Sequence, residues 1–118
     1  MSAPLSPEEV VRKFFDCYTS GRPDDFDQVV APDYADYGHT PPGRGPGRAR
    51  DDYQNAVKQV GAVIRYTIDA LVADGDMVAA DWTGTLPSGA TLRGLSLYRV
   101  TGGLLQSTRH AVIGDIPL

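Results

Sequence analysis

The sequence predicts an α+β domain in which the helices come first and an antiparallel sheet follows. Apolar residues recur at helical spacing up to Gly61 and alternate in the two-residue rhythm of a strand beyond it. Turn-forming residues divide the second half into four strands joined by hairpins. Three helices followed by such a meander are typical of helices packed on one face of a sheet. The length of 118 residues suits one domain, spanning residues 1–118.

The first helix is predicted over Pro7–Ser20. Ser6 is a suitable N-cap, Pro7 fits the first helical position, and Glu9 completes a capping box. Gly21 follows as a left-handed stop. These signals fix both ends of the element.

Three further segments are expected before Gly61. A short helix begins at about Pro23, and an extended piece covers Asp33–Tyr37. Prolines and glycines make residues 41–47 a loop, because neither a helix interior nor a central strand accepts that sequence. A third amphipathic helix runs from about Arg48 and ends at Gly61.

The turns also predict how the last strands pair, because the length of a hairpin loop fixes the register. A two-residue turn at Ser88-Gly89 would set Asp81 opposite Ser96. A three-residue loop at 101–103 would set His110 opposite Gly94. Since residues two apart share a face, these four residues and Tyr98 are expected on the face beneath the helices.

The opposite face is then expected to be apolar and to pack against a second subunit. It would carry Val78, Ala80, Trp82, Leu95, Leu97 and Ala111. A monomer would leave this patch exposed, so a homodimer through the outer sheet face is predicted.

Composition excludes several classes of function. The net charge of −4 argues against nucleic acid and anionic membrane surfaces as partners. The N-terminus has no signal-peptide pattern and no apolar run is long enough to span a membrane, so the cytoplasm is expected. No residues have metal-ligand spacing, and no dinucleotide fingerprint is present, so neither a metal nor a cofactor is expected. Cys17 is expected to pack in the core.

Three segments resemble the SnoaL-like polyketide cyclases of the NTF2-like superfamily. They are Val-Ala-Pro-Asp-Tyr-Ala-Asp-Tyr from Val30, the stretch Ala73–Thr85 with Ala-Asp-Gly-Asp-Met-Val at its start, and Arg-Gly-Leu-Ser-Leu-Tyr-Arg-Val from Arg93. The resemblance implies a cone of three N-terminal helices packed on a curved antiparallel sheet that encloses one pocket. It also implies a small hydrophobic molecule as the ligand.

The resemblance suggests roles for some residues. Asp81 and His110 stand where related epoxide hydrolases carry catalytic aspartates, and Ser96 stands where ketosteroid isomerase carries an acid. Ala79 replaces the arginine that those hydrolases need, and Phe14 replaces the isomerase tyrosine, so neither of those two mechanisms transfers directly. Asp115 resembles an aspartate in the last strand of the cyclases.

The candidate site therefore contains two proton-transfer groups and a set of binding residues. Asp81 and His110 are predicted to act as base and acid from opposite sides of a slot at Gly94. The predicted binding residues are Tyr18, Tyr37, His39, Gly94, Ser96 and Tyr98.

Cyclisation of a hydrophobic polyketide-type intermediate, by an aldol or oxa-type step, is the expected activity. A non-catalytic binding or auxiliary protein for a hydrophobic metabolite is the alternative. Epoxide opening or isomerisation on the same scaffold is a further one.

Overall fold

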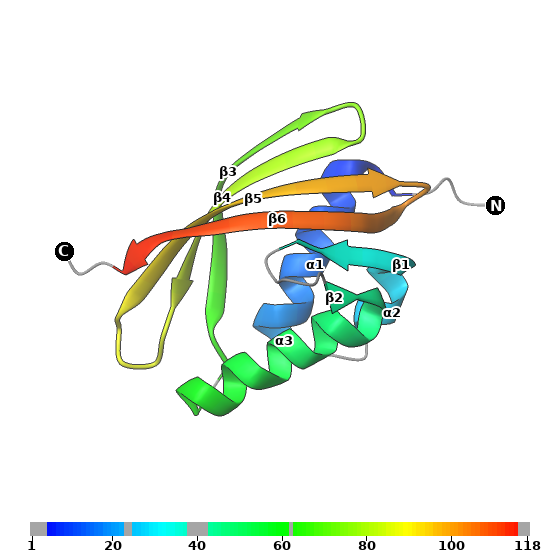
Figure 1. The fold of residues 1–118 in the computed structure, drawn as a ribbon. Helices are drawn as coiled ribbons and strands as arrows, with labels where there is room; N and C mark the ends of the chain where they lie inside the picture. Colours follow the sequence, from blue (N-terminus) through cyan, green and yellow to red (C-terminus); the bar gives the residue numbers. More distant parts are fainter. Residues whose placement is uncertain (1–4, 23–24, 38–42, 62, 116–118) are drawn as a thin grey trace.

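The computed structural model describes residues 5–22, 25–37, 43–61 and 63–115 and confirms the α+β architecture. Three helices, α1 (Pro7–Ser20), α2 (Phe26–Val29) and α3 (Gly45–Val60), accompany one six-stranded sheet (Figure 1). Its strands are β1 (Val30–Asp36), β2 (Gly43–Arg44), β3 (Arg65–Asp74), β4 (Met77–Thr85), β5 (Thr91–Thr101) and β6 (Leu104–Asp115). The strand order is β2-β1-β6-β5-β4-β3.

Helix α1 has the ends that its sequence predicts. The Glu9 amide donates to the Ser6 hydroxyl at 3.2 Å, and the Ser6 amide donates to the Glu9 carboxylate at 2.9 Å. Gly21 ends the helix in the left-handed conformation, with a φ of 73°. The face between these ends buries Val10 and Phe14 against the sheet.

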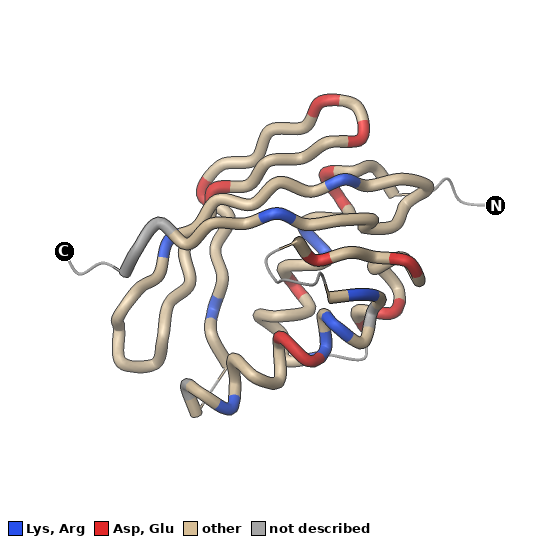
Figure 2. Tube along the Cα trace, viewed as in Figure 1, with Lys and Arg blue, Asp and Glu red and all other residues tan. Residues whose placement is uncertain are grey.

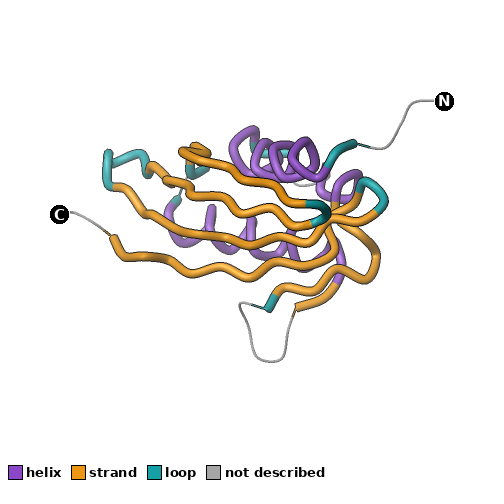
Figure 3. Tube along the Cα trace, turned by 90° about the horizontal axis from the view of Figure 1, so that it is seen from above, coloured by secondary structure: helices purple, strands orange, loops and turns teal. Residues whose placement is uncertain are grey.

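The helices gather on one side of the curved sheet, as the view from above shows (Figure 3). The core lies between the two layers and includes Phe26 from α2, Val78 and Trp82 from β4, and Leu105 from β6. All sheet pairings are antiparallel except that of β1 with β6, which is parallel. The sequence analysis predicted neither the two-residue strand β2 nor this parallel pairing. Over the described residues, no helix combines the length and apolar character of a membrane span.

The predicted pairing of β4 with β5 is wrong by one residue. Asp81 lies opposite Leu95, and Ala80 lies opposite Ser96. The reason is the loop: the Leu86 amide donates to the Ala90 carbonyl at 2.9 Å, which leaves a three-residue loop instead of the expected two. A shift of one residue moves every side chain of a strand to the other face.

The faces of β4 are consequently reversed relative to the prediction. Val78, Ala80 and Trp82 point into the core instead of forming an outer face. Leu95 and Leu97 do lie on the outer face, with exposed fractions of 50% and 42%.

The pairing of β5 with β6 also differs in detail but keeps the predicted face of His110. His110 lies opposite Ser96, two residues from the expected Gly94. The loop is one residue shorter than predicted, since Thr101 pairs with Leu104, and a bulge beyond Arg99 shifts the register once more. Each shift of one residue reverses the face on which a side chain lies, so the two shifts together leave His110 on the predicted face.

Candidate functional site

A cavity of about 290 Å³ lies between the sheet and the helices. Nearly half of the residues that line it are Phe, Tyr or Trp. Phe14 and Phe15 come from α1 and Trp82 comes from β4. These rings pack edge to face with neighbouring tyrosines; for example, the Phe14 and Tyr98 centroids are 6.0 Å apart. The wall therefore suits a flat apolar molecule.

Four tyrosines, Tyr18, Tyr34, Tyr66 and Tyr98, also line the cavity. Burial raises the pKa of each of these phenols above the usual 10.0. For Tyr34, a hydrogen bond to the Thr108 hydroxyl at 2.9 Å opposes that rise in pKa without cancelling it. All four phenols are protonated at neutral pH, so they can form hydrogen bonds with a ligand but cannot act as bases.

Two carboxylates stand among these rings. Asp36, at the end of β1, is only 2% exposed. Asp52, on α3, forms an ion pair with Arg48 one turn earlier, at 2.9 Å. Asp36 pairs with Thr108 across the β1–β6 ladder, so its side chain comes from the same part of the sheet as the Thr108 hydroxyl. Asp36 and Asp52 therefore bring carboxylates to the wall of the cavity.

His110 lines the same cavity from β6, two residues beyond Thr108. Unlike Asp36, it is exposed to solvent. From strand geometry, the Cα atoms of Asp36 and His110 are about 8 Å apart. His110 therefore faces both the cavity and solvent.

Ser96 and Trp82 form a buried polar contact beside Tyr98. The Trp82 indole Nε1 donates to the Ser96 hydroxyl at 2.9 Å. Burial raises the pKa of the Tyr98 phenol, and the neighbouring Ser96 hydroxyl opposes that rise in pKa. All three residues line the cavity.

The structure places Tyr18, Ser96, Tyr98 and His110 in one cavity, as the sequence analysis expects. It does not place Asp81 there. Asp81 lies on the outer face, and both of its carboxylate oxygens are 3.3 Å from the guanidinium of Arg93. The predicted pairing of Asp81 with His110 across a ligand is therefore wrong.

Two predicted binding residues, Gly94 and Tyr37, do not line the cavity either. The indole of Trp82 covers the Cα of Gly94, so there is no slot for a ligand. Tyr37 is 43% exposed and stacks under the guanidinium of Arg109, at 4.6 Å from its ring centroid. His39 lies outside the described residues.

Sequence reasoning missed Asp36 and Asp52. The alternation of Tyr34 and Asp36 along one strand is a signal that could have placed both side chains on a common face. Asp52 and Ala56, four residues apart on α3, likewise share a helix face. The strand position of Asp115 is described but its side chain is not. Among the described side chains, no group of three or more His, Cys, Asp or Glu could hold a metal ion.

Comparison with known proteins identifies a matching family. The family described as SnoaL-like domain matches residues 11–108, which is most of the chain. No curated protein matches the sequence.

Solved structures share the fold at low sequence identity. An NTF2-like protein of unknown function from Cytophaga hutchinsonii has a TM-score of 0.74 at 13% identity, over 95% of this chain and 94% of the other. A SnoaL-like polyketide cyclase from Agrobacterium tumefaciens has a TM-score of 0.76 at 14% identity, over 92% and 91%. IdmH from Streptomyces antibioticus, described as a candidate polyketide cyclase, has a TM-score of 0.77 at 20% identity, over 92% and 93%. These likenesses establish an NTF2-like fold.

Proposed function

Because the chain belongs to the SnoaL-like domain family, we propose that it binds a hydrophobic ring compound in the aromatic cavity and catalyses proton transfer on it. Cyclisation of a polyketide-type intermediate is the reaction we favour. Two structural neighbours described as polyketide cyclases support this choice. The proposed reaction uses no cofactor.

One observation carries the proposal: the carboxylate of Asp36 is buried in a cavity whose other lining residues are mainly aromatic or aliphatic. The carboxylate can therefore accept a proton from a carbon of a ligand bound there. The chemical role first expected of Asp81 passes to Asp36.

The reaction can be written with Asp36 and His110 alone. Asp36 takes a proton from the carbon beside a ligand carbonyl, and the electron pair moves onto the carbonyl oxygen. The enolate carbon then attacks a second carbonyl of the same molecule, which forms the new ring bond and an alkoxide. Protonated His110 gives its proton to the alkoxide, and the proton held by Asp36 then passes to His110 through water at the exposed side of His110, which restores both residues.

The size of the cavity limits the ligand. A cavity of about 150 Å³ holds one benzene molecule, and this one measures about 290 Å³. A ligand of about two fused rings therefore fills it.

A non-catalytic binding protein is the second candidate. The observation in its favour is that four protonated phenols and three apolar aromatic rings already suffice to bind an oxygenated ring compound. The two functions differ in whether a bound ketone exchanges its carbon-bound hydrogens.

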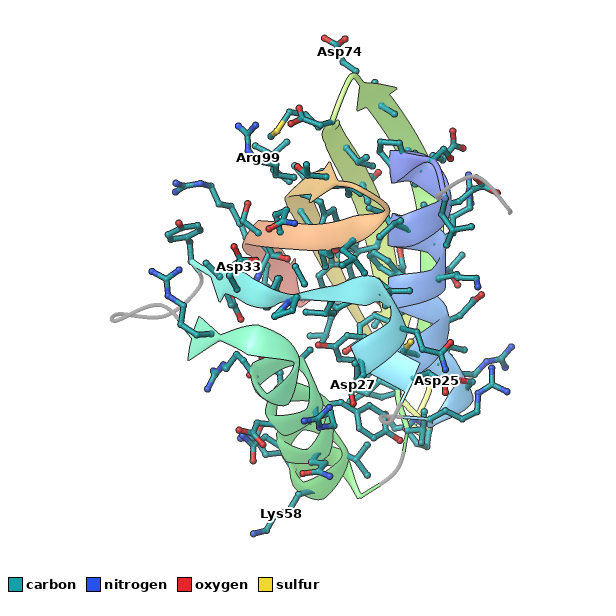
Figure 4. The ribbon with its side chains drawn as sticks, turned by 90° about the vertical axis from the view of Figure 1, so that its right-hand side faces the viewer. Asp25, Asp27, Asp33, Lys58, Asp74 and Arg99 are labelled. Carbon is teal, nitrogen blue, oxygen red and sulfur yellow. The ribbon has the colours of Figure 1, made fainter. Side chains whose placement is uncertain are left out.

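Deuterium exchange tests the proposal. We would incubate the protein with 2-tetralone in heavy water and follow loss of the hydrogens beside the carbonyl by NMR. The wild type should accelerate exchange, and Asp36→Asn should slow it by about 10²- to 10⁴-fold because the amide cannot accept the proton. Asp33→Asn is the matched control, since Asp33 lies on the same strand but is exposed (Figure 4).

Two results would contradict the proposal. One is a wild-type protein that binds 2-tetralone without accelerating exchange, which favours the binding protein. The other is an Asp36→Asn variant with full exchange. Fluorescence of Trp82 on addition of 2-tetralone checks that the variant still folds and binds, because Trp82 is the single tryptophan and lines the cavity.

A further inference from the structure

Trp82 makes a directed contact inside the cavity. Its indole lies over Gly94, and Nε1 is 2.9 Å from the hydroxyl oxygen of Ser96. An indole N–H can donate a hydrogen bond but cannot accept one. The Ser96 oxygen is therefore the acceptor in this contact, and the Ser96 proton is available for another partner.

A count of protons shows which groups can donate to that partner. Trp82, Ser96 and Tyr98 carry one polar hydrogen each, and Trp82 uses its own in the contact with Ser96. A hydrogen bond between Ser96 and Tyr98 would use one of the two O–H hydrogens and leave the other, whichever way it is directed. At least one O–H is therefore left for a ligand, on Ser96 or Tyr98, and both residues line the cavity.

The remaining O–H group is well placed to bind strongly. Ser96 is 6% exposed and Tyr98 is 3% exposed, so water competes little for the donor. In a chain of hydrogen bonds each donor polarises the next, which strengthens the last one. Asp36 lines the same cavity as Ser96 and Tyr98, so one ligand can contact both the hydroxyl groups and the carboxylate.

We propose that Trp82, Ser96 and Tyr98 form a donor relay that binds a ring-ketone oxygen of the ligand and stabilises the negative charge that oxygen gains. Ser96 and Tyr98 contact the ligand, and Trp82 is a positioning residue that acts through Ser96. The ligand is thus a ketone whose oxygen faces the relay while the neighbouring carbon faces Asp36. The inference rests on the proposed function and extends it to the substrate class.

Infrared spectroscopy of a bound ketone reports the relay directly. The carbonyl stretch of 2-tetralone, labelled with carbon-13 at the carbonyl, should move to lower frequency on binding to the wild type. Ser96→Ala and Tyr98→Phe should each reverse most of that shift, and Trp82→Phe should reverse part of it. Tyr37→Phe is the matched control, because Tyr37 is a tyrosine outside this cavity that is 43% exposed, and loss of its hydroxyl should leave the frequency unchanged.

Affinity gives a second measurement. Tetralin has the rings of 2-tetralone without the oxygen, so the ratio of the two dissociation constants isolates the carbonyl contact. We expect the wild type to prefer the ketone by about fivefold, and Ser96→Ala to lose that preference, in line with about 1 kcal/mol for one hydrogen bond. Ser96→Thr keeps a hydroxyl and should restore the preference and the frequency shift.

An unchanged carbonyl frequency in Ser96→Ala and Tyr98→Phe would overturn the relay. If Trp82→Phe does not fold, the comparison of Ser96→Ala with Ser96→Thr still decides, because the two differ in the hydroxyl that the relay needs. Failure here is separable from failure of the proposed function: deuterium exchange that depends on Asp36 without any carbonyl shift would retain the function and reject the relay.

Discussion

The Trp82 side chain packs directly against the backbone of Gly94. They lie opposite each other on β5 and β4, and the indole occupies the volume that a side chain at Gly94 would need. A Cβ atom on residue 94 would collide with the six-membered ring of the Trp82 indole. Glycine is required here for the close approach of the ring to the backbone.

Gly94→Ala should therefore destabilise the fold. Forcing a methyl group into a filled site costs about 1–3 kcal/mol in the free energy of unfolding. Urea denaturation followed by circular dichroism measures it. The double variant Gly94→Ala with Trp82→Leu should recover part of the loss, because the smaller side chain leaves room for the methyl group. A Gly94→Ala protein as stable as the wild type would show that the indole is not held there.

At the level of elements, the ends of α1 and the change from helix to strand near Gly61 were predictable because local chemistry decides them. A capping box and a left-handed glycine need only neighbouring residues. The loop between β4 and β5 was not decided locally. Pro87, Ser88 and Gly89 fit a two-residue turn or a three-residue loop, and the choice depends on which face of β4 the core accepts.

The one extra residue in the β4–β5 loop explains why Asp81 was wrongly expected in the cavity. With the observed loop, the apolar side chains of Val78 and Trp82 enter the core and Asp81 pairs with Arg93 in solvent. With the expected loop, the charge of Asp81 would have been buried instead, which is unfavourable without a partner. Asp36 was not predicted for a related reason. The parallel pairing of β1 with β6 brings together residues 72 positions apart, and no local signal in the sequence indicates this pairing.

For the molecule as a whole, the buried phenols link stability to pH. Burial is the main cause of the raised pKa of Tyr18 and of Tyr98, so at alkaline pH the unfolded chain loses these protons before the folded chain does. The stabilisation is complete below pH 10.0, the usual tyrosine pKa, and is lost as the pH rises above it.

The free energy of unfolding should therefore fall above about pH 10, by about 1.4 kcal/mol per pH unit for each tyrosine that stays protonated only in the folded state. Urea titrations at a series of alkaline pH values measure the slope. Tyr18→Phe should flatten it, because the variant lacks one such group. Tyr37→Phe should leave the slope unchanged, since Tyr37 is 43% exposed, and a slope that Tyr18→Phe does not alter would refute this account.

The outer face of the sheet is the remaining large surface. Two rows of opposed residues cross it: Val72, Ala79, Leu97 and Arg109 in one, and Ala70, Asp81, Leu95 and Ala111 in the other. We call the six apolar members of these rows the outer patch. Val72 is 67% exposed, and Arg99 projects from the same face at its edge (Figure 4). Acidic residues mark the tip of the β3–β4 hairpin beside the patch (Figure 2).

We propose that a second copy of the chain covers the outer patch, as a two-fold contact between identical faces. The patch brings apolar side chains from four neighbouring strands to one face, with Asp81 and Arg109 among them, and such a face favours association. Only Leu95, Leu97 and Ala111 of the residues first expected there belong to it, because the β4 residues point inward.

Substitution on the two faces of the sheet tests this dimer. Leu97→Lys would place a charge in the centre of the contact and should convert a dimer at micromolar concentration into a monomer, as measured by sedimentation velocity. Val112→Lys is the matched control, because Val112 is 55% exposed but lines the cavity on the opposite face. That variant should remain dimeric and lose affinity for 2-tetralone, whereas Leu97→Lys should keep it. A wild-type protein that sediments as a monomer at these concentrations would refute the two-fold contact and leave the outer patch exposed to solvent.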